Sequence, residues 1–164
     1  MYKLMLIVLM AGLWMTAQAL QIDEEMAMQL LDQSKRAVNR AAHAGAQQLD
    51  REALAEGRLR IDPAAASDYA MAYLRGNLQL DEAGAPLPNS PLKEPVRVLA
   101  LDVINDDHSF PYVYRNETYD FEAVLDKPGV VFIVRVAYPR IFAALDPIEW
   151  DIKGVSELVF MEER

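Results

Sequence analysis

The chain opens with an apolar run that restricts what it can fold into. Residues 4–22 (LMLIVLMAGLWMTAQALQI) hold no charged side chain and are interrupted only by Thr16, Gln18 and Gln21. At a helical rise of about 1.5 Å per residue these residues reach about 28 Å, close to the thickness of the hydrocarbon core of a bilayer. A helix this apolar with no charged face is unusual as the core helix of a soluble domain. The run therefore predicts a membrane-spanning helix or a signal segment over residues 1–22.

The charges on either side of the run predict its orientation. Lys3 precedes it, and three acidic residues follow it at positions 23–25. The positive-inside rule then places the N-terminus in the cytoplasm and the rest of the chain in the extracellular or periplasmic space. A single-pass membrane protein anchored in the lipid bilayer is the result.

A cleavable signal peptide is the competing interpretation, because Ala17–Gln18–Ala19 matches an A-x-A cleavage site. Cleavage after Ala19 would release a secreted acidic binding module. Retention as an anchor is favoured, since the run is longer than a usual signal h-region and continues without a helix breaker into a helical pattern. Both interpretations export the same domain.

Composition excludes several classes of function. The 16 Lys and Arg residues against 25 Asp and Glu give a net charge of −9, and an acidic surface disfavours nucleic-acid binding. The chain has no cysteine, which excludes disulfides, thiolate zinc sites and cysteine nucleophiles. His43 and His108 alone cannot build a histidine-rich metal site. We therefore expect a protein that is not an enzyme and needs no cofactor.

Residues 23–56 have the rhythm of a long alanine-rich helix that continues the apolar run. The segment contains no proline and a single glycine, and its apolar residues recur on one helical face. Gly57 is expected to cap its C-terminal end. Ala37, Ala41 and Gly45 form a small-xxx-small stripe that lets another backbone approach closely. The stripe can serve packing within the domain, which is the favoured interpretation, or helix packing against another molecule.

A second, shorter helix is announced by Asp62–Pro63, an N-cap residue followed by proline at the first helical position. The pattern continues to residue 77 or 78, so helices occupy residues 23–80. The tyrosines of this helix are expected to pack with wet hydroxyl tips, because aromatic residues at helical spacing usually belong to a core. Five residues can share one face: Ala66, Tyr69, Ala70, Tyr73 and Leu74.

Residues 81–95 (DEAGAPLPNSPLKEP) hold four prolines and predict a linker between a helical half and a sheet half. Beyond it, in residues 96–164, the hydrophobic period changes to two, which is typical of strands. Asp126–Gly129 reads as a turn, so the strands on either side of it are expected to form an antiparallel hairpin. The predicted strands cover residues 96–104, 112–115, 119–125, 130–138 and 148–160, with a candidate bend at Gly154.

The expected fold class is α+β. It comprises an N-terminal transmembrane helix continuous with a long alanine-rich helix, a second short helix, and then a mainly antiparallel β-sheet. Helices come first in the chain and strands follow, so the long helix is expected to lie on one face of the sheet.

Two groups of side chains could carry chemistry. Asp102, Asn105, Asp106 and Asp107 offer hard oxygen ligands of the kind that calcium prefers, although an ordinary turn with His108 exposed beside it is the favoured interpretation. Asp120 and Glu122 would share one face of a strand, where a solvated polar face predicts the same pattern. Neither group supplies a nucleophile, so no catalytic residue is assigned.

The aromatic residues Phe110, Tyr112 and Tyr114 cluster near the predicted start of the second strand. An aromatic group at a strand end is more often packing than a binding edge, and both interpretations stay open.

The order of these segments resembles a known family. The apolar run continues into SKRAVNRAAHAGAQQLD (Ser34–Asp50), and DPAAASDYAMAYLRGNL (Asp62–Leu78) follows. Residues 130–160 add a valine strand ending in Tyr–Pro and a closing strand through Gly154. Together these segments resemble TadE/TadG-like proteins of the Tad (Flp) pilus system, in which a membrane helix runs into alanine-rich helices.

The resemblance implies a non-enzymatic, membrane-anchored and outward-facing pilin-like protein. It would act in pilus assembly or as a minor structural component, with other pilus subunits as partners through helix packing. No Gly or Ala followed at the fifth place by Glu precedes the apolar run. A processed minor pilin and an unprocessed assembly factor therefore both remain open.

Overall fold

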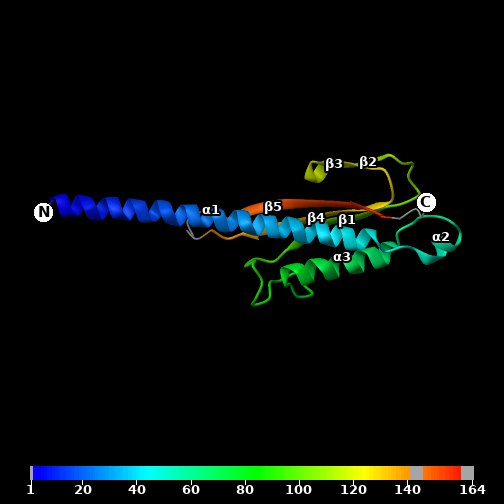
Figure 1. The fold of residues 1–164 in the computed structure, drawn as a ribbon, viewed down its shortest axis with the longest axis horizontal. Helices are drawn as coiled ribbons and strands as arrows, with labels where there is room; N and C mark the ends of the chain where they lie inside the picture. Colours follow the sequence, from blue (N-terminus) through cyan, green and yellow to red (C-terminus); the bar gives the residue numbers. More distant parts are fainter. Residues whose placement is uncertain (1, 141–145, 160–164) are drawn as a thin grey trace.

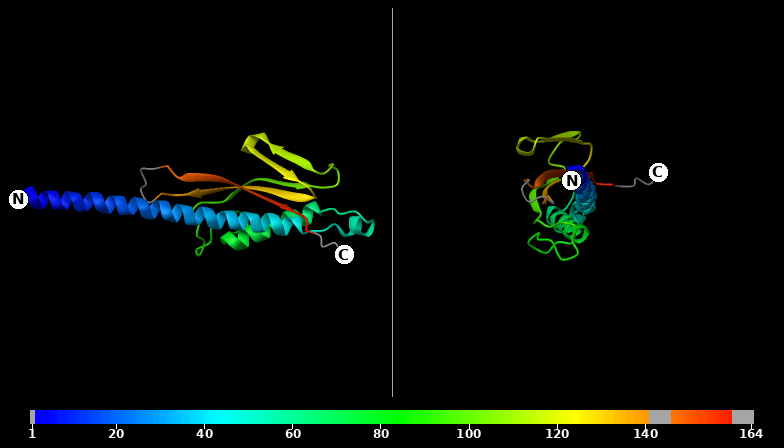
Figure 2. Two further views of the ribbon diagram at one scale, coloured as in Figure 1. Left: turned by 45° about the horizontal axis from the view of Figure 1, so that its top comes forward. Right: turned by 90° about the vertical axis from the view of Figure 1, so that its left-hand side faces the viewer.

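The computed structural model describes residues 2–140 and 146–159 and has the expected α+β architecture, arranged in three layers (Figure 1). Two helices, α1 (Tyr2–Ala46) and α3 (Pro63–Leu78), cover one face of a three-stranded antiparallel sheet. A two-stranded ribbon covers its other face (Figure 2). The remaining elements are α2 (Arg51–Ala55), β1 (Arg97–Ile104), β2 (Tyr112–Asn116), η1 (Glu117–Tyr119), β3 (Phe121–Leu125), β4 (Gly129–Tyr138) and β5 (Ile148–Glu157).

Helix α1 is one continuous helix of 45 residues, which corresponds to about 67 Å. Its first half projects beyond the rest of the protein, and its second half lies along the sheet (Figure 1). Burial begins at Asp23, directly after the apolar run. The predicted continuity of the apolar run with the alanine-rich helix is confirmed.

The predicted end of this helix near residue 56 is wrong. Helix α1 stops at Ala46, and the chain turns before α2, whose first N–H groups are capped by the Asp50 carboxylate at 3.0 and 3.1 Å. Gly57, with φ of +77°, ends only this short helix. After α1 the chain reverses direction, and an isolated antiparallel bridge between Leu49 and Ile61 stabilises the reversal. Helix α3 then runs back along α1.

Helix α3 begins as predicted. The Asp62 carboxylate accepts hydrogen bonds from the backbone N–H groups of Ala64 and Ala65 at 2.9 and 3.1 Å, and Pro63 occupies the first turn. The predicted shared face is divided, because Tyr69 and Tyr73 are about half exposed while the other three residues are buried. The buried stripe consists of Ala66, Ala70, Leu74 and Leu78.

The proline-rich segment 81–95 is an ordered loop packed on the end of α3. The Ser90 hydroxyl donates to the Leu78 carbonyl at 2.6 Å, and the Leu92 side chain is buried in the main core. A bridge between Leu80 and Pro86 folds the segment on itself. The loop therefore contributes to the core as well as connecting the two halves of the chain.

The three-stranded sheet has the order β1-β4-β5, with β4 in the centre. The predicted hairpin across Asp126–Gly129 is wrong, because β3 pairs with β2 while β4 pairs with β1 and β5. Residues 130–134 of β4 are all buried, so this strand needs cover on both faces and neighbours on both edges. Strand β3 alternates between partly buried and exposed residues, which suits an outer layer.

Gly154 does not bend its strand, since β5 pairs with β4 in unbroken register through this residue. Its role is a close approach between layers. A Cβ atom added at Gly154 would lie 2.9 Å from the Val38 Cγ1 atom of α1. The missing side chain lets α1 lie directly on β5.

Candidate functional site: the apolar helix and its surroundings

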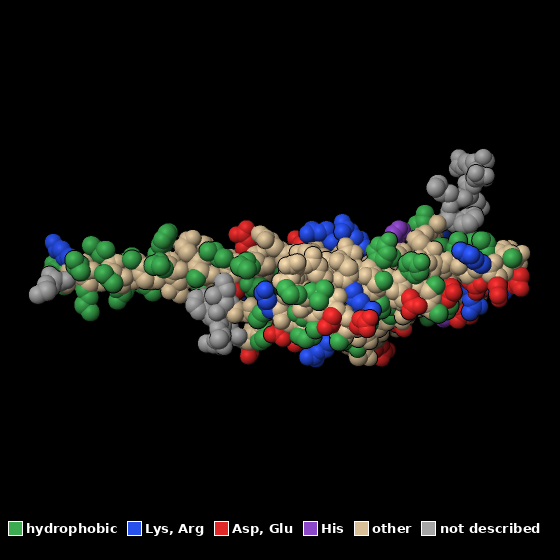
Figure 3. Space-filling model, turned by 90° about the horizontal axis from the view of Figure 1, so that it is seen from below, with side chains coloured by type: hydrophobic (Ala, Val, Ile, Leu, Met, Phe, Trp, Pro, Cys, Tyr) green, Lys and Arg blue, Asp and Glu red, His purple; other side chains and the backbone are tan. Residues whose placement is uncertain are grey.

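The first half of α1 presents apolar side chains on every side. Residues 2–22 are exposed except for Ala19, which is partly buried, and Trp14 is 66% exposed. Hydrophobic side chains dominate this projecting half, whereas the charged side chains visible on this face lie almost entirely over the domain (Figure 3). The helix is long and apolar enough to cross a membrane, and a signal sequence has the same properties. An apolar surface this large is of the kind that a membrane or another apolar partner covers.

A buried polar network lies where the apolar run ends. The Asp23 carboxylate is 1% exposed and accepts a hydrogen bond from the Tyr138 hydroxyl at 2.9 Å. The Arg140 guanidinium lies 3.9 Å from the other carboxylate oxygen. Burial raises the pKa of Tyr138, and the hydrogen bond to Asp23 raises it further. Because a buried carboxylate needs polar partners, this network fastens α1 to the end of β4 at the boundary of the domain.

From the sequence alone, Asp23 is one of three acidic residues that set membrane orientation. Its position directly after the apolar run gave no signal of a tertiary role, since Tyr138 lies 115 residues away in the chain.

The small-residue stripe is in contact with the chain itself. Ala37 and Ala41 are buried in the main core, and Gly45 faces α3. A Cβ atom added at Gly45 would lie 2.9 Å from the Ala66 carbonyl oxygen and 3.4 Å from the Ala70 Cβ atom. The close approach that the stripe allows is therefore made between α1 and α3 of one molecule, and the stripe is not free for a second one.

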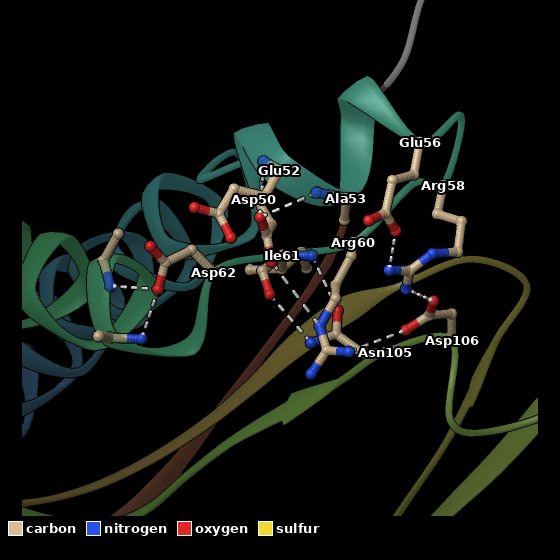
Figure 4. A network of polar contacts seen from close by, with 12 residues as sticks. Asp50, Glu52, Ala53, Glu56, Arg58, Arg60, Ile61, Asp62, Asn105 and Asp106 are labelled. Carbon is tan, nitrogen blue, oxygen red and sulfur yellow. Dashed lines mark hydrogen bonds and ion pairs between the residues drawn. The ribbon is translucent and has the colours of Figure 1, made fainter.

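The acidic turn, residues 102–107, holds the connection between α2 and α3 against the sheet. The buried Asn105 side chain accepts from the Ile61 N–H at 2.8 Å and donates to the Ile61 carbonyl at 3.0 Å. The Asp106 carboxylate pairs with Arg58 at 3.0 Å and with Arg60 at 3.6 Å (Figure 4). An amide side chain here replaces the backbone partner that Ile61 would have in a sheet.

The other two side chains of the predicted calcium loop have partners elsewhere. Asp102 accepts a hydrogen bond from the Tyr114 hydroxyl, and the Asp107 carboxylate lies 3.3 Å from His108 Nδ1. Within residues 2–140 and 146–159, no group of three or more His, Cys, Asp or Glu residues is placed to hold a metal ion. The structure does not bring the four oxygen-bearing side chains together as a ligand set.

The remaining candidates lie on or next to the outer ribbon that β2 and β3 form, or beneath it. Glu122 pairs with Arg115 at 2.9 Å on the outer ribbon, whereas Asp120 occupies a left-handed position, with φ of 45°, just after η1. Tyr114 packs between the ribbon and the sheet, and this burial raises its pKa. The aromatic cluster, which also contains Phe110 and Tyr112, thus packs beneath the ribbon.

Two surface grooves flank α1. One, of about 530 Å³, lies between α1 and α3 and is lined by Asn39, Arg40, His43, Ala44, Gln47, Gln48, Tyr69 and Tyr73. The other, of about 520 Å³, lies between α1 and β5 and is lined by Leu31, Lys35, Asn39, Glu149, Trp150, Asp151, Ile152 and Lys153. At the first groove, His43 Nδ1 lies 3.1 Å from the Ser156 hydroxyl oxygen. In the second groove, Glu149 and Asp151 pair with Arg135 at 3.8 and 2.7 Å.

Comparison of the chain with protein-family models, with curated proteins and with solved structures finds no match.

Proposed function

We propose that this protein is a non-enzymatic, single-pass membrane protein of pilin-like type, which acts in Tad pilus assembly or as a minor structural component. The observation that carries the proposal is the division of α1. One half is an exposed apolar rod, and the other half is part of the core of an α+β domain. A single continuous helix thus joins the proposed membrane anchor to a folded domain.

The energetics favour the bilayer for the apolar half. Residues 4–22 contain eight Leu, Ile and Val residues, each worth about −0.3 to −0.6 kcal/mol on an insertion scale. Their sum is roughly −2 to −5 kcal/mol. With no charged residue in the run to oppose this sum, the segment inserts as a helix whose backbone hydrogen bonds are all internal.

The orientation follows from the flanking charges. Lys3 stays on the cytoplasmic side, and Glu24 and Glu25 lie on the outer side with the domain. Asp23 packs into the domain through Tyr138, so no flexible linker separates the anchor from the folded part. The domain would lie close to the outer surface of the membrane that α1 spans.

The contacts of the side chains that were candidates for catalysis or metal binding support the proposed structural role. Four of the candidates are engaged in ion pairs and hydrogen bonds that hold loops and strands together: Asp102, Asn105, Asp106 and Glu122. The Tad-like assignment rests on the sequence resemblance together with this architecture of apolar rod and antiparallel sheet.

Cell fractionation with N-terminal sequencing tests the anchor. We expect the full chain, with Lys3 near its N-terminus, in the membrane fraction after a high-salt wash. Protease added to intact cells or spheroplasts should remove the domain. A mature protein that begins at Leu20 in the culture fluid would instead establish the secreted binding module.

The pilus role needs a separate test. Deletion of the coding sequence should reduce the number of surface pili in the source organism, and a plasmid copy should restore them. Unchanged pilus numbers in the deletion strain, with a protein that is membrane-bound in the parent strain, would reject the pilus role and leave the anchor intact.

A further inference from the structure

Strand β5 leaves a long edge of the sheet open. It is the last strand in the order β1-β4-β5, and its ten residues pair with β4 from Glu157 to Ile148 without a shift in register. No other strand of the described chain pairs with it. It contains no proline and no bulge, two of the features that interrupt an edge, and its protection against pairing is limited to charged side chains such as Lys153.

The hydrogen-bond pattern shows which backbone groups face outward. The Leu158 N–H donates to the Pro128 carbonyl at 2.7 Å, so by the two-residue period the even-numbered residues of β5 bond to β4. The odd-numbered residues then direct their N–H and C=O groups to the open side. Consistently, the Glu157 carbonyl accepts from the Gln47 side chain at 3.3 Å.

Further along this edge, the outward groups of residues 149, 151, 153 and 155 have no hydrogen-bond partner among the residues that the structure describes. These four residues offer a row of donors and acceptors with the spacing that an added strand requires.

The opposite edge of the sheet is blocked. The register of β1 shifts between Val98 and Ala100, which interrupts its regular ladder. The Val96 N–H, just before β1, donates to the Gly84 carbonyl at 2.9 Å, and the Tyr119 hydroxyl contacts the Leu99 carbonyl at 3.5 Å. Only one of the two sheet edges therefore offers a regular ladder.

The groove between α1 and β5 adds side-chain pockets to this open edge. On the face of the sheet that α1 covers, the apolar surface of the groove comes from Leu31 of α1 and Trp150 of β5. Both side chains pack against the main core. Lys35 lies at the helix flank of the same groove. An added strand would place alternate side chains on this apolar surface.

By the two-residue period, the other face of the edge carries the side chains of Glu149, Asp151 and Lys153. Asp151 and Glu149 are engaged by Arg135, at 2.7 and 3.8 Å. Lys153 has no ion pair among the described residues, and the same holds for Lys35. Lys153 on this face and Lys35 on the helix side of the groove are thus the two basic side chains here without an ion pair, and they favour an acidic partner.

A second copy of the chain fits this edge poorly. Helix α1 and the strands run nearly along one axis (Figures 1 and 2). Antiparallel pairing of β5 with β5 of a copy would reverse the copy, and the two apolar helices would leave in opposite directions. This step rests on the proposed membrane anchor. A copy in the same orientation would have to pair in parallel, either through its interrupted β1 edge or through its own β5, and parallel pairing is slightly less stable per residue.

We propose that β5 binds an extended segment of another polypeptide, which adds to the sheet as a fourth strand. Its apolar side chains would lie against Leu31 and Trp150, and its acidic side chains would lie toward Lys153. Backbone hydrogen bonds to residues 149, 151, 153 and 155 supply affinity, and the alternating side chains supply specificity.

Hydrogen exchange of the full chain in detergent micelles tests the proposal. The probe is a blocked ten-residue peptide of alternating glutamate and valine, and the matched control has lysine in place of glutamate. We expect the acidic peptide to slow exchange at the amides of Glu149, Asp151, Lys153 and Val155 by about tenfold or more. Amides of the even-numbered β5 residues, already bonded to β4, should not change.

Two variants separate the backbone contribution from the charge. Lys153→Pro removes an outward N–H and should abolish the protection, while Lys153→Ala keeps the N–H and should only weaken binding. Continued protection of the even-numbered amides shows that the Lys153→Pro sheet is intact. If the Lys153→Pro variant unfolds, the peptide titration of the unsubstituted chain alone tests whether a strand adds to β5.

Three results would overturn the proposal. Outward amides that are already slow in dilute protein would mean that the edge is covered. Protection that depends on protein concentration without peptide would identify a second copy as the occupant. Equal protection by the lysine peptide would reject the acidic partner. None of these outcomes alters the fractionation result, so the membrane anchor stands or falls separately.

Discussion

Gly45 offers the sharpest test of how the two helices pack. In Gly45→Ala, the new Cβ atom would lie 2.9 Å from the Ala66 carbonyl oxygen, a backbone atom that cannot rotate away. Helix α3 must then move away from α1. Overpacking of this kind costs about 1–3 kcal/mol, against a gain of up to about 1 kcal/mol from replacing a helical glycine by alanine.

Gly76→Ala is the matched control, because it gives the same gain without the clash. Gly76 lies in α3, and a Cβ atom there would meet nothing within 4 Å. The difference between the two variants therefore isolates the packing cost. We expect Gly45→Ala to be less stable than Gly76→Ala by about 1–3 kcal/mol, which at about 2–4 °C per kcal/mol for a domain of this size is a measurable difference in Tm.

Fluorescence in detergent provides the assay. Trp150 packs against the core and reports on domain unfolding, whereas Trp14 is exposed on the apolar half and should stay constant in a micelle. Equal unfolding free energies for the two variants would refute the close approach of α1 and α3. The stripe of Ala37, Ala41 and Gly45 would then again be available for contact between molecules.

Three further substitutions test other parts of the structure. Leu13→Arg should reduce the share of the protein in the membrane fraction, since it changes the insertion free energy by about 3–4 kcal/mol, which is comparable to the whole insertion free energy of the run. Asn105→Ala should lower the free energy of unfolding by at least about 2 kcal/mol in denaturant titrations, because it leaves the Ile61 N–H and C=O buried without partners. Asp151→Asn should destabilise the domain at neutral pH but not in acid. The hydrogen bond from Arg135 lowers the pKa of Asp151, so its contribution is present above the ordinary carboxyl pKa and is lost as pH falls through the lowered value. Unfolding measured at neutral pH and at a pH below the lowered pKa of Asp151 checks this. Unchanged membrane retention of Leu13→Arg, full stability of Asn105→Ala, or a pH-independent gap for Asp151→Asn would contradict the respective argument.

Elements with a strong local signal were predicted well from the sequence. Asp62–Pro63 contains its own N-cap, and α3 begins there. The five strands lie close to their predicted positions because alternation of apolar residues is a property of each segment alone. Helical periodicity was a weaker guide to where α1 ends, since residues 47–56 have helical composition and the Asp50 cap divides them.

Pairings and contacts were harder to predict. A turn at Asp126–Gly129 is compatible with a hairpin, but the buried β4 strand needs neighbours on both edges, and β1 and β5 fill them. The partnership of Asn105 with Ile61 had no local signal, because Asn in a turn is common and its buried partner lies 44 residues away. From the sequence alone, the acidic turn therefore resembles a set of metal ligands. In the fold, Asn105 and Asp106 hold the connection between α2 and α3 against the sheet.

By itself, the sequence determined the apolar helix, its length, the charges that flank it and the α+β order of segments. These features depend only on neighbouring residues and on the periods of helix and strand. Only the tertiary structure decided where burial begins on α1, that the small-residue stripe packs within one molecule, and which sheet edge is left open. Each of those depends on surfaces brought together from distant parts of the chain, and the free energy of such contacts is absent until the layers have packed.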